Sequence, residues 1–406
     1  MRRFQLLQYR FETPRQLSFC DCTERFVNAR CEYVLNFSSN VIKLTKNGET
    51  WFFKEAKLHR KSIEDCVYES IDLFFDEIVP SPALKAKVLE SLQKKQRLNR
   101  LIDMGHKNSS GSRFNRYLTV GDTDCLGLPT PSSPDEQSQL RKLVFYLYSE
   151  VQNWFLNSGV KAGDLETFSA VRALSTYALA EMLGVGYLIP RCDFVKIRIN
   201  GKEKYGVLTE EAKGESPLSH PYSQRARRVT PQLLCSLTDL NLLDAISRDN
   251  DHRVGNYHVV TDESQNYISI LSYDNDSPDS YRLSADVGSA NLVGCSGFLD
   301  KRGFVNRAHL SERSASALTS IGESQIRARL PYLSKAQIWF LIRRIEKVKK
   351  AIARSAEACG DFLLEDSEWS TEHIRKDISG EYGKTYLMSL LHDCYYEGGL
   401  HAFDML

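Results

Sequence analysis

The sequence predicts an α+β protein with a small antiparallel β-rich part followed by a mainly helical part. Residues 30–54 hold two β-rich runs joined by Asn47-Gly48, and Asn-Gly is a strong signal for a hairpin turn. Residues 193–213 hold two more such runs around Asn200-Gly201. Residues 306–406 have a mostly helical pattern. Strands that precede a run of helices are typical of the α+β class.

The composition is that of a globular protein without a strong overall charge. The chain has 406 residues, of which 42% are hydrophobic and 26% charged, enough for a large core in two or three lobes. Its formal net charge of +1 excludes a global field that would attract nucleic acid, so no nucleic-acid partner is expected. The ten cysteines show no CxxC pair and no metal-site spacing, which favours reduced thiols.

No membrane span and no secretory signal are expected. The first residues, MRRFQLLQYRFETPRQ, are basic at the start but lack an apolar stretch of about 7–15 residues. No window approaches the roughly 20 apolar residues that a spanning helix needs. We therefore expect a cytoplasmic protein, and delivery into another cell as an effector is compatible with the same features.

A helical insertion is expected between the two pairs of strands, over about residues 55–163. Residues 106–137 are polar and rich in Ser, Gly and Pro, so they are expected to form a loop. The last helix before the second pair of strands has Asp164 as its expected N-cap and Gly184 at its end. The expected helices are 62–78, a lysine-rich helix from Pro82, 138–158 and 164–183.

The C-terminal part is expected to contain a helix over 230–247, a hairpin over 257–274 and further helices. Ser334 is the expected cap of one of these helices. The apolar stripe of this helix is expected to be core; it consists of Ile338, Leu341, Ile342, Ile345 and Ile352.

Two short stretches hold the residues expected to do chemistry. Residues 248–260, RDNDHRVGNYHVV, place Asp251 and Asn256 in a polar loop that leads into a strand. Asp274 follows the next strand, in the segment SYDND. A hairpin between these strands would bring two carboxylates and one amide together. Phosphoryl transfer needs a divalent metal, a carboxylate near the attacking hydroxyl and cations on the phosphates, and Mg²⁺ prefers oxygen ligands.

This arrangement resembles that of protein kinases, whose catalytic loop has an Asp, four residues and then an Asn, with a metal-binding Asp at a later strand end. DHRVGN at 251–256 is most similar to the branch of HipA-like kinases and phosphatidylinositol 3/4-kinases, and SYDND resembles the tyrosine–aspartate metal motif of HipA-like proteins. The chain departs from the family in that His252 directly follows the Asp, and it lacks the DFG tripeptide. The resemblance implies Asp251 as the catalytic residue, and Asn256 and Asp274 as ligands of Mg²⁺ or Mn²⁺.

The resemblance also implies a bilobal protein-kinase-like fold that binds ATP. The N-lobe would be residues 1–215 and the mainly helical C-lobe residues 216–406, with the catalytic loop at 248–260 and the metal motif at 272–276. GETWFFKEA resembles the strand that presents the phosphate-anchoring lysine, here Lys54.

Six further positions around the nucleotide site follow from the resemblance. KYGVLTEEAKG would be the hinge strand, whose backbone at Glu210 and Glu211 meets adenine. Ser38 and Ser39 belong to the candidate phosphate-covering loop, which has no glycine. Two glutamates compete as the ion-pair partner of Lys54: Glu166, at the start of the helix before the hinge strands, is preferred to Glu69.

The residues around these motifs have plainer interpretations. Asp249 and Asp276 flank the motifs and are expected to add solubility more than chemistry. His252 is expected to pack within the loop rather than act as a base. Arg225, Arg227 and Arg228 form a basic segment, interpreted as a solvated face, with a clamp for phosphate or an acidic substrate as the alternative.

Three classes of function remain open from the sequence. The preferred one is a kinase that transfers the γ-phosphate of ATP to a hydroxyl of a protein substrate, on Ser or Thr. The second is a lipid or small-molecule kinase, or a kinase fold used for nucleotidyl transfer. The third is a nucleotide-binding pseudokinase that acts as an interaction module, and the intact Asp251 argues against it.

Overall fold

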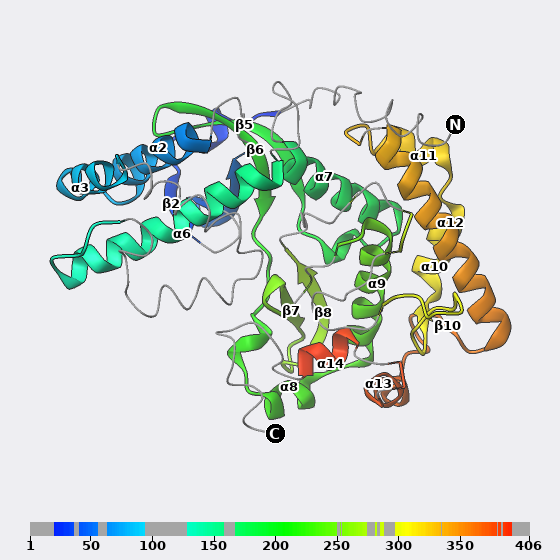
Figure 1. The fold of residues 1–406 in the computed structure, drawn as a ribbon. Helices are drawn as coiled ribbons and strands as arrows, with labels where there is room; N and C mark the ends of the chain where they lie inside the picture. Colours follow the sequence, from blue (N-terminus) through cyan, green and yellow to red (C-terminus); the bar gives the residue numbers. More distant parts are fainter. Residues whose placement is uncertain are drawn as a thin grey trace.

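The computed structural model of the chain describes residues 20–35, 40–55, 63–93, 128–157, 167–249, 252, 254–273, 281, 285–287, 297–333, 335–379, 381–382 and 385–391. Strands gather in the N-terminal part and helices dominate after residue 217 (Figure 1). The predicted α+β class is therefore confirmed.

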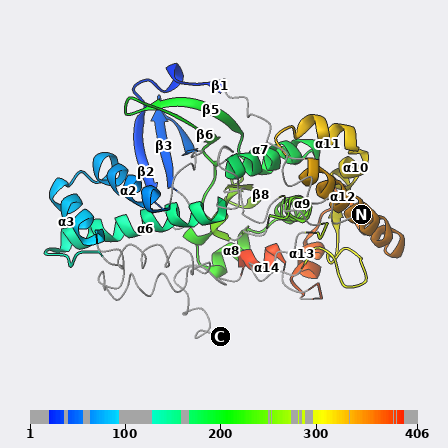
Figure 2. The same ribbon diagram turned by 45° about the horizontal axis from the view of Figure 1, so that its top comes forward.

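Within the described residues, six strands form one sheet in the order β1-β5-β6-β4-β3-β2 (Figure 2). Neighbouring strands of this sheet are antiparallel except β1 and β5, which are parallel. The predicted pairing of segments 30–54 and 193–213 in one antiparallel sheet is confirmed. The strands are β1 (Cys20–Asp21), β2 (Arg30–Leu35), β3 (Asn40–Lys46), β4 (Glu49–Glu55), β5 (Cys192–Ile199) and β6 (Lys202–Glu210).

The two Asn-Gly turns form as the sequence predicts. Asn47 and Gly48 have φ of 54° and 81°, and Asn200 and Gly201 have φ of 50° and 77°. Two consecutive left-handed residues define the turn whose twist matches antiparallel strands, and Asn and Gly adopt this conformation at the lowest cost.

The two faces of the sheet are buried against different parts of the chain. Ile42, Phe53 and Leu208 belong to a small core on one face, which Phe26 of the short helix η1 (Glu24–Phe26) joins. Phe194 and Val207 belong instead to the main core of the protein. Successive side chains of a strand alternate between faces, so the sheet separates these two cores.

The predicted helical insertion has a core of its own and extends to one side of the sheet (Figure 1). It consists of α2 (Ile63–Leu73), the π-helical segment η2 (Phe74–Ile78), α3 (Pro82–Leu92) and α6 (Pro134–Asn157). Helix α6 begins at Pro134 rather than at residue 138, because the Ser133 hydroxyl accepts from the Glu136 N–H (3.1 Å) and caps the first turn. Glu77 of η2 links the insertion to the sheet by accepting from Tyr33 Oη (2.7 Å) and Lys202 Nζ (2.8 Å).

The main core runs from the sheet through α7 (Thr167–Met182) and α9 (Pro231–Ser247) to α12 (Lys335–Ala358). Helix α7 ends where predicted, since Gly184 has φ of 69°. The α12 stripe is confirmed as core, with Ile342 only partly buried. The core crosses residue 215 without a break in packing, and the two-lobed kinase arrangement stays a proposal.

The remaining elements are η4 (Gly186–Leu188), η5 (Pro217–Ser219), α8 (Tyr222–Arg228), η6 (Val254–Asn256), β7 (Tyr257–Thr261), β8 (Tyr267–Ser272), β9 (Leu310–Ser311), α10 (Glu312–Ser320), α11 (Glu323–Arg329), β10 (Leu363–Leu364), α13 (Thr371–Ile378) and α14 (Tyr386–Leu391). Of these, β8, β9, α13 and α14 pack against α9. Over the described ranges, none of the helices combines the length and apolar character needed to cross a bilayer.

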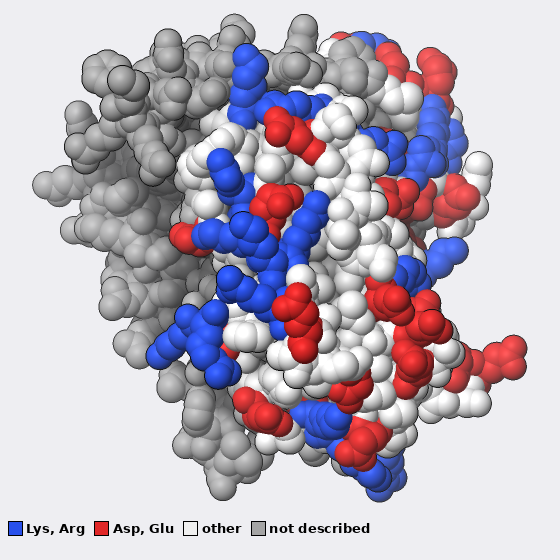
Figure 3. Space-filling model, turned by 90° about the vertical axis from the view of Figure 1, so that its right-hand side faces the viewer, with Lys and Arg blue, Asp and Glu red and all other residues white. Residues whose placement is uncertain are grey.

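Helix α12 forms the outer side of the molecule and presents a basic stripe. Arg343, Lys347, Lys350 and Arg354 are exposed along it, and Figure 3 shows Lys and Arg side chains gathered on this side, with acidic side chains beside them. The Arg343 guanidinium lies 5.2 Å from the centre of the Trp339 ring. Although the formal net charge is only +1, basic side chains are therefore concentrated locally along α12.

Candidate functional site

Helix α9 is buried along most of its length and ends directly before the predicted catalytic loop. Thr230 caps its start, since its hydroxyl accepts a backbone N–H at 3.2 Å. Arg248 ends it in the left-handed conformation, with φ of 64°. The fully buried Arg344 of α12 donates from Nε to the carbonyl of Ile246 (2.7 Å), in the last turn, where helix carbonyls lack intrahelical partners. Burial lowers the pKa of this guanidinium to about 10, which still leaves it protonated at neutral pH.

A buried carboxylate on α9 holds the loop that follows. His252 Nδ1 lies 2.6 Å from Asp244 Oδ1, and both side chains are almost completely buried. Tyr386 of α14 donates its hydroxyl to the other carboxylate oxygen at 2.5 Å. An ionised carboxylate only accepts hydrogen bonds, so Nδ1 of His252 is the donor. His252 is therefore a packing residue of the loop, as the sequence predicts.

The predicted hairpin follows the loop and brings its two ends together. Strands β7 and β8 are antiparallel, with Tyr257 opposite Ser272. The Tyr273 N–H donates to the Asn256 carbonyl (2.9 Å), and the Tyr273 hydroxyl donates to the Gly255 carbonyl (2.6 Å). Asn256 is buried. Tyr273, which precedes Asp274 in the chain, is therefore hydrogen-bonded to the main chain of the predicted metal ligand Asn256.

Lys54 lies on the side of the sheet on which α7 packs. It is opposite Val207 of β6, which is opposite Phe194 of β5. Directly opposed residues of antiparallel strands share a face, and Phe194 and Val207 share a core with α7. Phe53, the neighbour of Lys54, is buried on the other face. The half-buried Lys54 thus projects toward the helix that Glu166 precedes in the chain.

The predicted hinge residues Glu210 and Glu211 lie at the end of β6, with exposed side chains. The Glu210 N–H donates to the Arg191 carbonyl (3.0 Å) and the Glu211 N–H to the Thr50 carbonyl (3.3 Å). Both N–H groups are therefore used within the protein. Donation from these two positions to adenine would require the strand end to rearrange.

The segment after the hinge residues crosses from the sheet to the hairpin. Glu215 and Val259 exchange two backbone hydrogen bonds, of 3.0 and 2.9 Å. Gly214 has φ of 118°, and a Cβ there would lie 2.4 Å from the Val259 carbonyl oxygen. Only glycine fits this crossing. The His258 ring also contacts the Ala212 carbonyl (2.9 Å), so the hairpin is fastened to the end of the sheet at two levels.

Several predicted positions lie outside the described residues. They are Ser38, Ser39, Glu166, Asp251, Asp274 and Asp276. Of the nucleotide and metal residues, the structure describes Lys54, Glu210, Glu211 and Asn256. It also describes Glu69, which is exposed on α2. Asp249 is buried at the start of the loop, so its interpretation as an acid that adds solubility is wrong.

The interpretation of residues 225–228 as one solvated basic face is wrong. Arg225 is buried and donates to the Leu390 carbonyl of α14 (2.9 Å). Arg228 pairs with Glu215 at 2.8 Å, next to the crossing segment. Arg227 alone is exposed. Two of the three arginines thus hold neighbouring segments in place.

Sequence reasoning missed Asp244, Tyr386 and Arg344, which hold the loop. A signal for Asp244 exists, because α9 is rich in leucine and a carboxylate buried in such a helix requires partners. No comparable signal marks Tyr386, which is 142 residues away along the chain.

Among the described residues, no group of three or more His, Cys, Asp or Glu side chains could hold a metal ion; Asp251 and Asp274 fall outside that set. No family model matches the chain, and no curated protein matches it. The functional argument therefore rests on the sequence motifs together with the geometry of the described residues around them.

Proposed function

We propose that the chain is an ATP- and Mg²⁺-dependent kinase-like phosphotransferase that moves the γ-phosphate to a hydroxyl, first of all on Ser or Thr of a protein. The observation that carries this proposal is the bond between Tyr273 and Asn256 (2.9 Å). It joins Asn256, the last residue of the motif at 251–256, to the residue before Asp274. This bond is between main-chain atoms, and it places the residue before Asp274 next to Asn256, as a metal site formed by the Asn256 and Asp274 side chains would require.

The position of Lys54 supports the proposal independently. A phosphate-anchoring lysine must project toward the helix that carries its glutamate partner. Lys54 shares the α7 face of the sheet with Val207. Glu77, in the segment after α2, instead contacts Tyr33, which is opposite Ile42 on the other face. The shared face of Lys54 and α7 is compatible with Glu166, which precedes α7 in the chain, as the first candidate partner, and Glu69 of α2 stays the second candidate.

The available donors fit a hard divalent ion. Carboxylate and amide oxygens from Asp274 and Asn256, completed by water and phosphate, are the ligands that Mg²⁺ prefers, and Mn²⁺ accepts the same set. When bound, the ion neutralises charge on the transferring phosphate. Asp251 then orients the attacking hydroxyl and accepts its proton, and Lys54 holds the α- and β-phosphates.

Turnover with ATP labelled at the γ or the α phosphate tests the proposal. Label transfer from the γ position alone is the expected result, and transfer from the α position would indicate nucleotidyl transfer instead. Asp274→Ala should abolish transfer and metal-dependent nucleotide binding. Asp251→Ala should abolish transfer while nucleotide binding persists, because its role belongs to the transition state.

Asn256→Ala gives a graded test, with activity partly rescued by higher Mg²⁺ or by Mn²⁺. Arg227→Ala is the matched control, since Arg227 is exposed. Nucleotide binding with no transfer to any protein, lipid or small-molecule acceptor would support the pseudokinase alternative. Unchanged transfer by Asp274→Ala would end the kinase proposal.

A further inference from the structure

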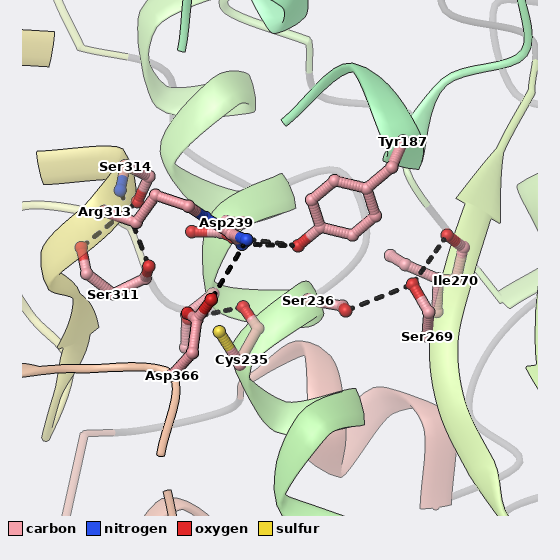
Figure 4. Close-up of polar contacts among 11 residues, drawn as sticks. Tyr187, Cys235, Ser236, Asp239, Ser269, Ile270, Ser311, Arg313, Ser314 and Asp366 are labelled. Carbon is pink, nitrogen blue, oxygen red and sulfur yellow. Dashed lines mark hydrogen bonds and ion pairs between the residues drawn. The ribbon is translucent and has the colours of Figure 1, made fainter. Parts of the chain in front are cut away.

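Helix α9 carries two buried carboxylates, Asp239 and Asp244, and each accepts from one tyrosine and one basic side chain. Figure 4 shows the first set, in which Asp239 Oδ2 accepts from Tyr187 Oη (3.0 Å) and from Arg313 (3.0 Å). Asp244 accepts from Tyr386 Oη and His252 Nδ1. In both sets, a carboxylate of α9 accepts hydrogen bonds from a tyrosine and a basic side chain.

The two sets differ in what they connect. Tyr187 belongs to η4 and Arg313 to α10. Arg313 also donates a hydrogen bond to the Asp366 carboxylate (3.2 Å). The first set therefore connects η4, α9 and α10 to one another. In the second set, His252 is the residue next to Asp251 in the predicted catalytic loop, and Tyr386 is the first residue of α14.

We propose that Asp244, His252 and Tyr386 form a positioning unit through which α14 fixes the predicted catalytic loop for transfer. The inference rests on the proposed function. Consecutive Cα atoms are about 3.8 Å apart, so a fixed His252 limits the movement of Asp251. Each oxygen of the Asp244 carboxylate has one of these two donors, and the loss of either leaves a buried acceptor unsatisfied.

A second buried contact, from α8 to α14, supports this unit. Arg225 of α8 donates to the Leu390 carbonyl within α14 (2.9 Å) and so holds the helix that supplies Tyr386. The loop, α9 and α14 are therefore connected by hydrogen bonds between buried groups. Such bonds are strengthened by the low local dielectric, and the removal of one member weakens the others.

Tyr386→Phe tests the unit, with Tyr187→Phe as the matched control. Both changes remove one phenol that donates to a carboxylate of α9 and leave the second donor in place. Hydrogen exchange of the amides of residues 249–256 should accelerate roughly 10- to 100-fold in Tyr386→Phe and stay unchanged in Tyr187→Phe. Because Tyr187 is more exposed than Tyr386, exchange is compared at denaturant concentrations that give equal global stability.

Kinetics supply the second readout. Tyr386→Phe should lower kcat by at least about tenfold with the nucleotide Kd unchanged, because the loop acts in the transition state. His252→Asn should keep most of kcat, since an amide N–H can replace Nδ1–H, whereas His252→Ala should lose it. A merely structural role would not separate these two His252 variants at equal stability.

The outcomes distinguish this inference from the proposed function. A wild-type protein without any transfer would refute the proposed function, while the exchange experiment would still decide whether Tyr386 fixes the loop. Transfer by the wild type together with unchanged exchange and kcat in Tyr386→Phe would overturn the positioning unit alone. Equal acceleration in Tyr187→Phe would also overturn it, since the effect would then be general to α9.

Discussion

The replacement Gly206→Ala tests the pairing of β4 and β6 that positions Lys54. A Cβ on Gly206 would lie 2.2 Å from the Lys54 carbonyl oxygen and 2.8 Å from the Phe53 ring. Real Cβ atoms essentially never approach closer than 3.0 Å, so the strands must separate by about 0.8 Å. A backbone oxygen in a ladder cannot swing away as the end of a side chain can. Overpacking of this kind costs about 1–3 kcal/mol.

The unfolded chain acts in the opposite direction for the same substitution. Replacing Gly by Ala reduces the entropy of the unfolded state and stabilises by about 0.4–1 kcal/mol. The clash is the larger effect, so Gly206→Ala should destabilise by about 1–2 kcal/mol. A displacement near 1 Å at Lys54 should also lower transfer by roughly 10- to 100-fold.

Urea unfolding and labelled-ATP turnover measure the two effects separately. Gly360→Ala is the control, because a Cβ there meets nothing within 4 Å, and its free energy of unfolding should equal that of wild type or exceed it by up to about 1 kcal/mol. A Gly206→Ala protein as stable as the control would refute the pairing of Gly206 with Glu55, and with it the assignment of Lys54 to the α7 face.

Three further predictions concern the helical part. Arg225→Met should lower the free energy of unfolding by about 1–3 kcal/mol, because a buried carbonyl loses its donor. The free energy of unfolding of Arg227→Met should stay within about 0.5 kcal/mol of wild type, because Arg227 is exposed. Equal effects of the two changes in urea unfolding would contradict this difference in burial. Thr230→Ala should cost about 1 kcal/mol through loss of the α9 cap, measured in the same way. Burial lowers the pKa of both His309 and His373, whose rings lie 4.4 Å apart, so their contribution to stability is full above about pH 6.5 and falls as the pH drops below that value. Melting temperatures at pH 7 and pH 5 should therefore differ less in His373→Gln than in wild type, and an unchanged difference would exclude this residue.

Local patterns predicted most of what the structure confirms. The turns at Asn47-Gly48 and Asn200-Gly201 depend on the backbone preferences of two residues, and the α12 stripe depends on helical spacing. The β7–β8 hairpin is equally local, and it alone predicted that Asn256 meets the chain just before Asp274.

Features that depend on distant partners could not be predicted in the same way. The burial of Arg225 requires a carbonyl 165 residues later in the chain, and nothing nearby in sequence distinguishes it from the exposed Arg227. The Asp244 pairing with Tyr386 has the same long range. The start of α6 is also a local feature, but the polar residues around Ser133 predict a loop there, whereas Ser133 caps the helix.

The continuous core on both sides of α7 restricts how a nucleotide could enter and leave. Phe194 and Val207 of the sheet share this core with Leu179 of α7 and Leu237 of α9. If the sheet separated from α9, these side chains would be exposed to water. The free-energy cost would be about 25 cal/mol per Å² of apolar surface exposed. If the chain binds nucleotide as proposed, exchange of ATP for ADP should therefore depend on movements of loops and not on separation of the sheet from α9.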